Sequence, residues 1–175
     1  MKKVLLSIVL FIFCLTNQSF AQSDNGWSVK AGAGVLPYNG KVICGIDAVY
    51  EYHFGNGLHL GAGTAVIVNP VYLKSNKTRI EIPVFGEIRY CFLKGNTVSP
   101  FLGAELGILG DFTDHGTGYI AKPLIGLEIK RFEVSCGFTK LSATYDEIGK
   151  INNETSLIGG RYENSGASLH LRYRF

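Results

Sequence analysis

Histidines next to acids or hydroxyls are the residues of this chain whose types and spacing could do chemistry. His115 directly follows Asp114, and His170 lies two residues after Ser168. A histidine held by an acid can act as the general base of a hydrolase or acyltransferase, provided that a serine stands within its reach. No motif for such a nucleophile surrounds His115, and alternation places Ser168 and His170 on the polar face of their segment. The sequence therefore predicts polar side chains here and no catalytic residues.

A second pair of histidines has spacing that could serve metal binding. His53 and His59 flank the turn Gly55-Asn56-Gly57, so they can approach each other across a hairpin. Imidazoles ligate zinc well, but two histidines without an identified third ligand do not define a site. We expect a pair of polar residues on the polar faces of two neighbouring strands, lining the mouth beside this turn, with no metal and no cofactor.

The elements that must position these residues are strands. Eight segments alternate apolar and polar residues, whereas no segment has a helical period. The predicted strands are 27–37, 42–54, 58–68, 78–92, 98–109, 119–130, 132–142 and 166–175. The links after the second, fourth and sixth strands are short, and those after the third, fifth and seventh are longer. The short link 38–41 after the first strand is the exception.

The N-terminal segment has the composition of a secretory signal peptide. Lys2 and Lys3 precede an apolar run from Val4 to Leu15, and Ser19-Phe20-Ala21 offers small residues for cleavage. We expect residues 1–21 to be removed and residues 22–175 to form one domain. Without the two lysines the chain has 15 basic and 14 acidic side chains, and no basic stripe, which excludes nucleic acid as a partner. Cys44, Cys91 and Cys136 have no metal-ligand spacing and are expected to be apolar fillers.

The C-terminal segment alternates strictly up to the last residue. Leu169, Leu171, Tyr173 and Phe175 are apolar, and the residues between them are polar. This pattern resembles the terminal strand of Gram-negative outer-membrane β-barrels, where it is an assembly signal. Together with the strand count, it makes the chain similar to the small OmpA/OmpX-like barrels. The resemblance implies an all-β, eight-stranded, antiparallel up-and-down transmembrane barrel in the outer membrane, in contact with its lipid and with the barrel-assembly machinery.

Two features of the strands indicate that the apolar face is the outer one. Glycines lie on the polar face among charged residues, as in Gly61 and Gly63 beside His59, which suits the crowded interior of an eight-stranded barrel. Aromatic residues of the apolar face gather at one end, as expected for a girdle at a membrane interface. The predicted periplasmic girdle is Trp27, Tyr52, Phe54, Tyr90, Phe92 and Phe132.

The polar face then lines the lumen, and its charges can be counted. The basic residues are Lys30, Arg79, Arg89, Lys122, Lys130, Arg172 and Arg174. The acidic residues are Asp47, Glu51, Glu81, Glu87, Glu105, Glu128 and Glu133. Seven charges of each sign predict an interlocked network that plugs the barrel rather than a selective ring of one sign.

The resemblance leaves several functions open. The leading interpretation is a non-enzymatic structural or surface-interaction barrel that uses its extracellular loops. The alternatives are a narrow passive pore, a lipid-modifying enzyme and a secretion-assembly factor. The last link, 143–165, is unusually long and contains apolar residues such as Tyr145, Ile148 and Tyr162. It is either a surface for an extracellular ligand or protein, or an extension of the flanking strands.

Overall fold

The computed structural model describes residues 26–70, 78–93, 97–111, 116–151 and 154–175. The segment expected to be a signal peptide, and the Asp114-His115 pair, lie outside these residues. The strands are β1 (Gly26–Tyr38), β2 (Lys41–Phe54), β3 (Leu58–Asn69), β4 (Arg79–Cys91), β5 (Val98–Asp111), β6 (Thr117–Ile129), β7 (Phe132–Ile151) and β8 (Glu154–Arg174). None of the described residues forms a helix long and apolar enough to cross a membrane.

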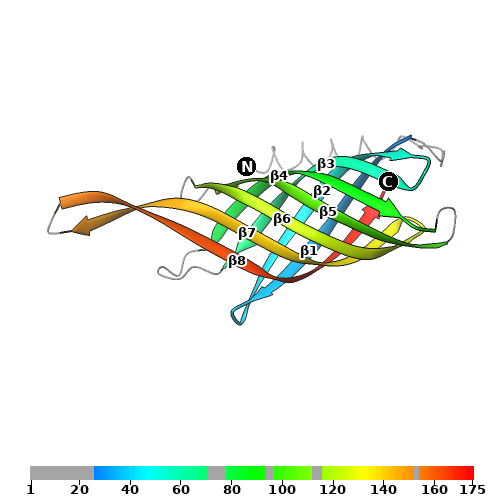
Figure 1. Ribbon diagram of the computed structural model, residues 1–175. Coiled ribbons are helices and arrows are strands. Elements are labelled where there is room, and N and C mark those ends of the chain that lie inside the picture. Colours follow the sequence, from blue (N-terminus) through cyan, green and yellow to red (C-terminus); the bar gives the residue numbers. More distant parts are fainter. Residues whose placement is uncertain (1–25, 71–77, 94–96, 112–115, 152–153) are drawn as a thin grey trace, which may run out of the picture.

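The eight strands close into an antiparallel barrel in which each strand pairs with its neighbours in sequence. Closure is made by β1 and β8, which pair from Lys30 with Arg174 to Val35 with Leu169. The link Asn39-Gly40 has positive φ at both residues, as a two-residue hairpin turn requires. In Figure 1 the turns after β2, β4 and β6 lie at one end, called here the short-turn end, and the opposite end is the long-loop end.

The last hairpin extends far beyond the rest of the barrel. The pairing of β7 with β8 continues up to Ile151 and Glu154, whereas β6 pairs with β7 only as far as Ala143. Figure 1 shows this two-stranded ribbon projecting from the long-loop end. The sequence placed the ends of these strands at Ser142 and Gly166 and treated 143–165 as a link. The link is therefore mostly strand, which confirms the predicted extension of the flanking strands.

The outward face of the barrel is predominantly apolar, and its charged side chains Lys140 on β7 and Glu163 on β8 lie toward the long-loop end. Ile46, Leu106 and Ile108 are among the most exposed, with 65%, 66% and 71% of their surface accessible. Cys44 and Cys136 are exposed on this face, and Cys91 is buried in the interior. A large apolar surface of this kind is not stable in water and needs an apolar environment.

Glycines on the inward face make room for large side chains on neighbouring strands. A Cβ added to Gly126 would lie 2.6 Å from the Phe101 ring, and one added to Gly63 would lie 2.8 Å from the Phe85 ring. Phe101 and Phe85 are themselves buried. The glycines thus allow a narrow barrel to be filled with bulky groups, which is the packing that the sequence pattern predicted.

Candidate functional site

The interior of the barrel toward the short-turn end contains one connected network of ion pairs. Arg89 on β4 contacts Glu51 at 3.1 Å, Glu133 at 2.7 Å and Glu128 at 3.2 Å. Lys30 on β1 lies 2.8 Å from Glu87 and 3.0 Å from the same Glu133. Since these residues come from five strands, the network connects opposite walls of the barrel.

Arg172 on the last strand is the second centre of the network. Its guanidinium lies 2.9 Å from Asp47 on β2, 2.7 Å from Glu87 on β4 and 2.7 Å from Glu105 on β5. Lys122 on β6 adds a contact of 2.6 Å to Glu105. The side chain of Arg172 is 1% exposed, so its carboxylate partners replace the water that a charged group needs.

The network ends at the short-turn mouth. Arg174 contacts Glu128 at 2.6 Å, and both side chains are partly exposed. Lys130 was predicted to be one of the lumen charges. It lies instead in the exposed turn before β7, with a positive φ of 56°. The two-residue turn between Ile129 and Phe132 explains this, because its residues leave the alternation of the strands.

A separate polar cluster lies at the long-loop end. Glu81 accepts hydrogen bonds from Asn69 at 2.8 Å and from the Tyr162 hydroxyl at 2.7 Å. Arg79 pairs with Asp111 at 3.2 Å and stacks over the Tyr162 ring at 4.5 Å. Arg79 and Glu81 were expected to belong to a single lumen network. The structure puts them in this second cluster, because they are at the start of β4 whereas Glu87 and Arg89 are near its end.

Apolar side chains lie between the two polar clusters. On β4, Phe85 comes between Glu81 and Glu87, and on β5, Leu109 comes between Glu105 and Asp111. The cluster consists of Leu36, Ile43, Val49, Phe85, Leu109, Ile120, Leu141 and Ala143, and Tyr162 of the polar cluster at the long-loop end packs against it. The inward face is therefore not uniformly polar. The alternation of the sequence separates inside from outside but does not show this division along the barrel axis.

The interior charges of the described residues are not balanced. The network near the short-turn end joins the cations Lys30, Arg89, Lys122, Arg172 and Arg174 with the carboxylates Asp47, Glu51, Glu87, Glu105, Glu128 and Glu133. These are five positive and six negative groups. The cluster at the long-loop end adds Arg79 with Glu81 and Asp111. The equal count expected from the sequence fails because Lys130 is outside and Asp111, assigned to a loop, is inside.

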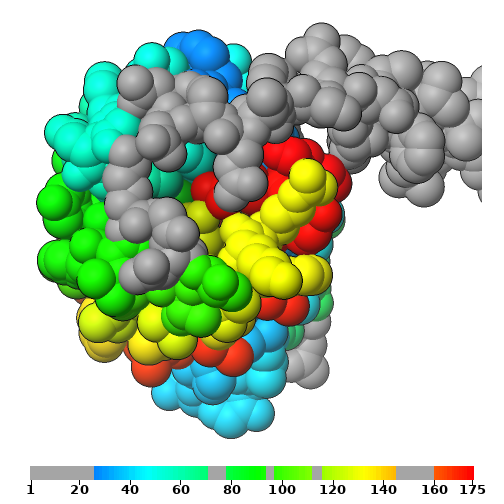
Figure 2. All heavy atoms as spheres, turned by 90° about the vertical axis from the view of Figure 1, so that its right-hand side faces the viewer, coloured from blue at the N-terminus to red at the C-terminus, as the bar shows by residue number. Residues whose placement is uncertain are grey.

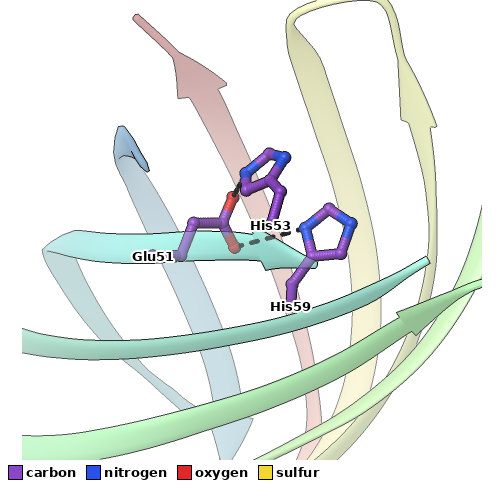
Figure 3. Close-up of side chains that lie close together, drawn as sticks. All are labelled: Glu51, His53 and His59. Carbon is purple, nitrogen blue, oxygen red and sulfur yellow. Dashed lines mark hydrogen bonds and ion pairs between the residues drawn. The ribbon is translucent and has the colours of Figure 1, made fainter. Parts of the chain in front are cut away.

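The two histidines of the β2–β3 hairpin meet at the short-turn mouth. His53 is paired directly with His59 in the β ladder, and their ring centroids are 4.1 Å apart. Figure 3 shows both imidazoles turned toward the carboxylate of Glu51, whose oxygens lie 3.0 Å from His53 Nε2 and 3.8 Å from His59 Nδ1. The approach of the histidines follows from the turn, but the participation of Glu51 was not anticipated.

The serine and histidine of the last strand do not form a catalytic pair in this structure. Ser168 Oγ accepts a hydrogen bond from Thr139 at 2.7 Å, and its other contact is the Gly137 carbonyl at 3.4 Å. The His170 ring lies beside Asp47 at 3.7 Å and Lys122 at 3.4 Å. A general base must be within hydrogen-bond reach of the nucleophile, and these contacts turn the two side chains to different partners.

The girdle residues lie at the short-turn ends of β1, β2, β4 and β7, and this end of the barrel faces the viewer in Figure 2. Trp27 stacks on Tyr50 at 4.6 Å, Tyr90 lies edge-on to Phe92 at 5.4 Å, and Phe132 is edge-on to Tyr173 at 5.2 Å. Tyr52 and Phe54 form another edge-on pair at 4.9 Å. Of the residues in the C-terminal pattern, Leu169 and Leu171 face outward, each 53% exposed. Tyr173 and Phe175 lie edge-on to each other and belong to the aromatic girdle at the short-turn end.

One solved structure with a similar fold is that of Neisserial surface protein A. It superimposes with a TM-score of 0.50 and 17% sequence identity over 87% of this chain and 98% of that chain. No protein-family model matches the sequence, and no curated protein matches it. At this identity the similarity concerns the fold alone. Together with the closed antiparallel topology, it confirms the predicted fold class: this chain has the eight-stranded fold of the small outer-membrane barrels.

Proposed function

We propose that this chain is an integral outer-membrane barrel with a closed lumen, which acts without catalysis as a structural or surface-interaction protein. The observation that carries the proposal is the contrast between its two faces. The outward face has large exposed apolar side chains, while the inward face has interlinked charges. This is the inverse of a water-soluble barrel and matches a barrel surrounded by lipid.

The outward face also indicates where the lipid would end. On β7, Phe132 and Phe138 are exposed apolar residues, and the next outward residue is Lys140. Lys140 pairs at 3.6 Å with Glu163, which lies on β8 next to Arg161 at 2.9 Å. Charged groups are costly in the hydrocarbon layer, so we place the outer boundary near Lys140 and the projecting ribbon in the aqueous exterior.

The filled interior supports a structural role rather than transport. An eight-stranded barrel is just wide enough for its own side chains, and here Arg89, Arg172 and the apolar cluster around Phe85 occupy that space. A water path would have to break ion pairs whose members are 0–3% exposed. We therefore rank the passive pore below the closed barrel. The orientation of Ser168 and His170 gives no support to the enzyme alternative.

The projecting ribbon of β7 and β8 is the part we assign to contacts outside the cell. It continues β7 and β8 beyond the barrel, and at its base the Tyr162 hydroxyl donates a hydrogen bond to Glu81 on β4. It is thereby held at a defined place above the mouth.

The membrane assignment can be tested through the single tryptophan of the chain. Trp27 belongs to the aromatic girdle at the short-turn end, and its side chain is 49% exposed. In vesicles of brominated phospholipids we expect strong quenching of the Trp27 fluorescence. The quenching should be strongest when the bromines are close to the headgroups, because interfacial tryptophans lie at that depth. Fluorescence that brominated lipids leave unchanged in a folded, vesicle-associated protein would overturn the proposal.

A further inference from the structure

We propose that His53, His59 and Glu51 form a binding site for a divalent transition-metal ion of the zinc class at the short-turn mouth of the barrel. The site goes beyond the structural role above and is independent of it. Each of the three residues offers one ligand atom, and all these atoms lie within 4.8 Å of one another. Zinc bonds of about 2.0–2.2 Å place neighbouring ligand atoms about 3.5 Å apart, so small side-chain rotations suffice.

The hairpin holds the two histidines in place. They face each other across β2 and β3 and point inward. Each is two residues from the turn 55–57 that joins the two strands. Glu51 is two residues before His53 and shares its face, so the strand itself brings the carboxylate under both rings (Figure 3). Two imidazoles and one carboxylate are a donor set suited to zinc, copper or nickel rather than to magnesium or calcium.

The surroundings complete the site on one side and leave it open on the other. Ser28 Oγ lies 2.8 Å from His53 Nε2 and 3.2 Å from Glu51, close enough to orient either ligand. The side chains of His53 and His59 are 17% and 9% exposed, so an ion can enter from the mouth and retain water. Glu51 is almost completely buried and forms the floor of the site.

Two cations next to the site have other partners that can hold them when a metal enters. Arg89 donates to His59 Nδ1 at 2.9 Å and to Glu51, but it also contacts Glu133 at 2.7 Å. Lys30 contacts Glu51 at 3.1 Å and has Glu87 at 2.8 Å. Releasing Glu51 toward a metal therefore leaves neither cation unpaired.

The charge of the network favours an additional cation at this place. The described network near the short-turn end has one more carboxylate than it has basic side chains, as counted above. A negative excess in a confined interior attracts a cation, so the network does not oppose a metal ion next to Glu51. The two histidines supply neutral donors that do not add to the negative charge.

The experiment uses the refolded chain without a histidine tag, and Zn²⁺ itself is the probe. Isothermal titration and metal analysis after dialysis should give one tightly bound Zn²⁺ per barrel, which excess Mg²⁺ does not displace. We expect His53→Gln and His59→Gln each to weaken binding by about tenfold or more, the range seen when a metal site loses orienting or ligating groups. His115→Gln removes a histidine outside the described residues and is the matched control.

Imidazole ¹⁵N resonances give a second measurement that does not depend on affinity. Zn²⁺ should shift the signals of His53 and His59 and leave that of His170 in place. If His59→Gln fails to fold on a gel-shift assay, His53→Gln decides the question, because its more exposed side chain is less needed for folding. Unchanged Zn²⁺ affinity in folded His53→Gln, or unshifted signals for both histidines, would overturn the proposal.

Discussion

At the residue scale, Arg172 shows how the interior charges stabilise the barrel. It belongs to the strand that closes the barrel and contacts carboxylates on β2, β4 and β5. Forming such a buried network offers little net gain over apolar packing, but removing one member leaves its partners uncompensated. The consequence is that single substitutions in the network should be much more costly than those of surface pairs.

We expect Arg172→Met to lower the free energy of unfolding by about 3–5 kcal/mol, because several buried carboxylates lose the positive charge that compensates them. Arg161→Met on the same strand is the control, since the Arg161 side chain is 57% exposed and pairs with an exposed Glu163. Its cost should be below about 1 kcal/mol. Urea unfolding from lipid vesicles, followed by Trp27 fluorescence, measures both. Equal losses would show that the interior charges are solvated and not interlocked.

Glycines offer a second comparison between the inside and the outside of the barrel. Gly126→Ala would place a methyl group 2.6 Å from the Phe101 ring, and should cost about 1–3 kcal/mol of stability through overpacking. A Cβ at Gly86, on the outward face, has no neighbour closer than 3.9 Å. Gly86→Ala should change stability by less than about 0.5 kcal/mol. The same unfolding assay applies, and a neutral Gly126→Ala would argue against a tightly filled lumen.

The sequence could predict which side chains share a strand face, but not where they lie along the barrel axis or which partners they contact. Alternation assigned Arg79 and Arg89 to one set, although their positions along β4 place them in two clusters. Asp111 was missed because β5 continues two residues past its expected end. The third ligand at the histidine pair was missed for a related reason: Glu51 is near in sequence, but only the orientation of its carboxylate between the rings makes it relevant.

At the element scale, the last strand is expected to have a role in assembly as well as in closure. Phe175 donates its backbone N–H to the Val29 carbonyl at 2.9 Å, and its ring lies edge-on to Tyr173 at 5.1 Å. We expect Phe175→Ala to reduce the folded protein in the outer membrane several-fold in cells, while refolding in detergent stays efficient. Phe132→Ala, which removes another aromatic residue at the same end, should have little effect in cells. Similar losses for both variants would indicate that only the girdle matters.

The ribbon should be dispensable for folding. The pairing of β6 with β7 extends no farther than Ala143, and the ribbon contacts Glu81 on β4 through Tyr162. Replacing residues 145–160 by Asn-Gly joins Thr144 to Arg161, which are already partners in the ladder, and retains Tyr162. We expect a heat-modifiable barrel whose unfolding midpoint is nearly unchanged. Failure of this variant to fold would mean that the ribbon stabilises the barrel.

The length of this ribbon could not be predicted from the sequence either. Asn152-Asn153 and Gly159-Gly160 are typical of turns, so the segment 143–165 looked like a loop. Cross-strand pairing outweighs these local preferences, because β7 and β8 form a continuous ladder from Phe132 with Tyr173 to Ile151 with Glu154. The other strands end within about two residues of their expected ends, because their alternation is unbroken.

At the scale of the whole molecule, the barrel combines an apolar exterior with an interior in three parts. A charged network lies toward the short-turn end, an apolar cluster lies in the middle, and a polar cluster including Tyr162 lies at the long-loop end. Each part is poorly suited to conduct ions: the charges are paired, the apolar layer excludes water, and the polar cluster is buried. We therefore propose a closed barrel that presents a ribbon to the exterior.

Single-channel conductance in a planar bilayer tests this account most directly, using refolded protein that migrates differently on gels before and after boiling. We predict no reproducible current steps from the wild-type barrel, since its interior ion pairs and apolar cluster leave no continuous water path. An unrelated large porin in the same bilayer controls for sensitivity. Reproducible small steps from correctly folded protein would contradict the closed lumen and make the narrow pore the leading function.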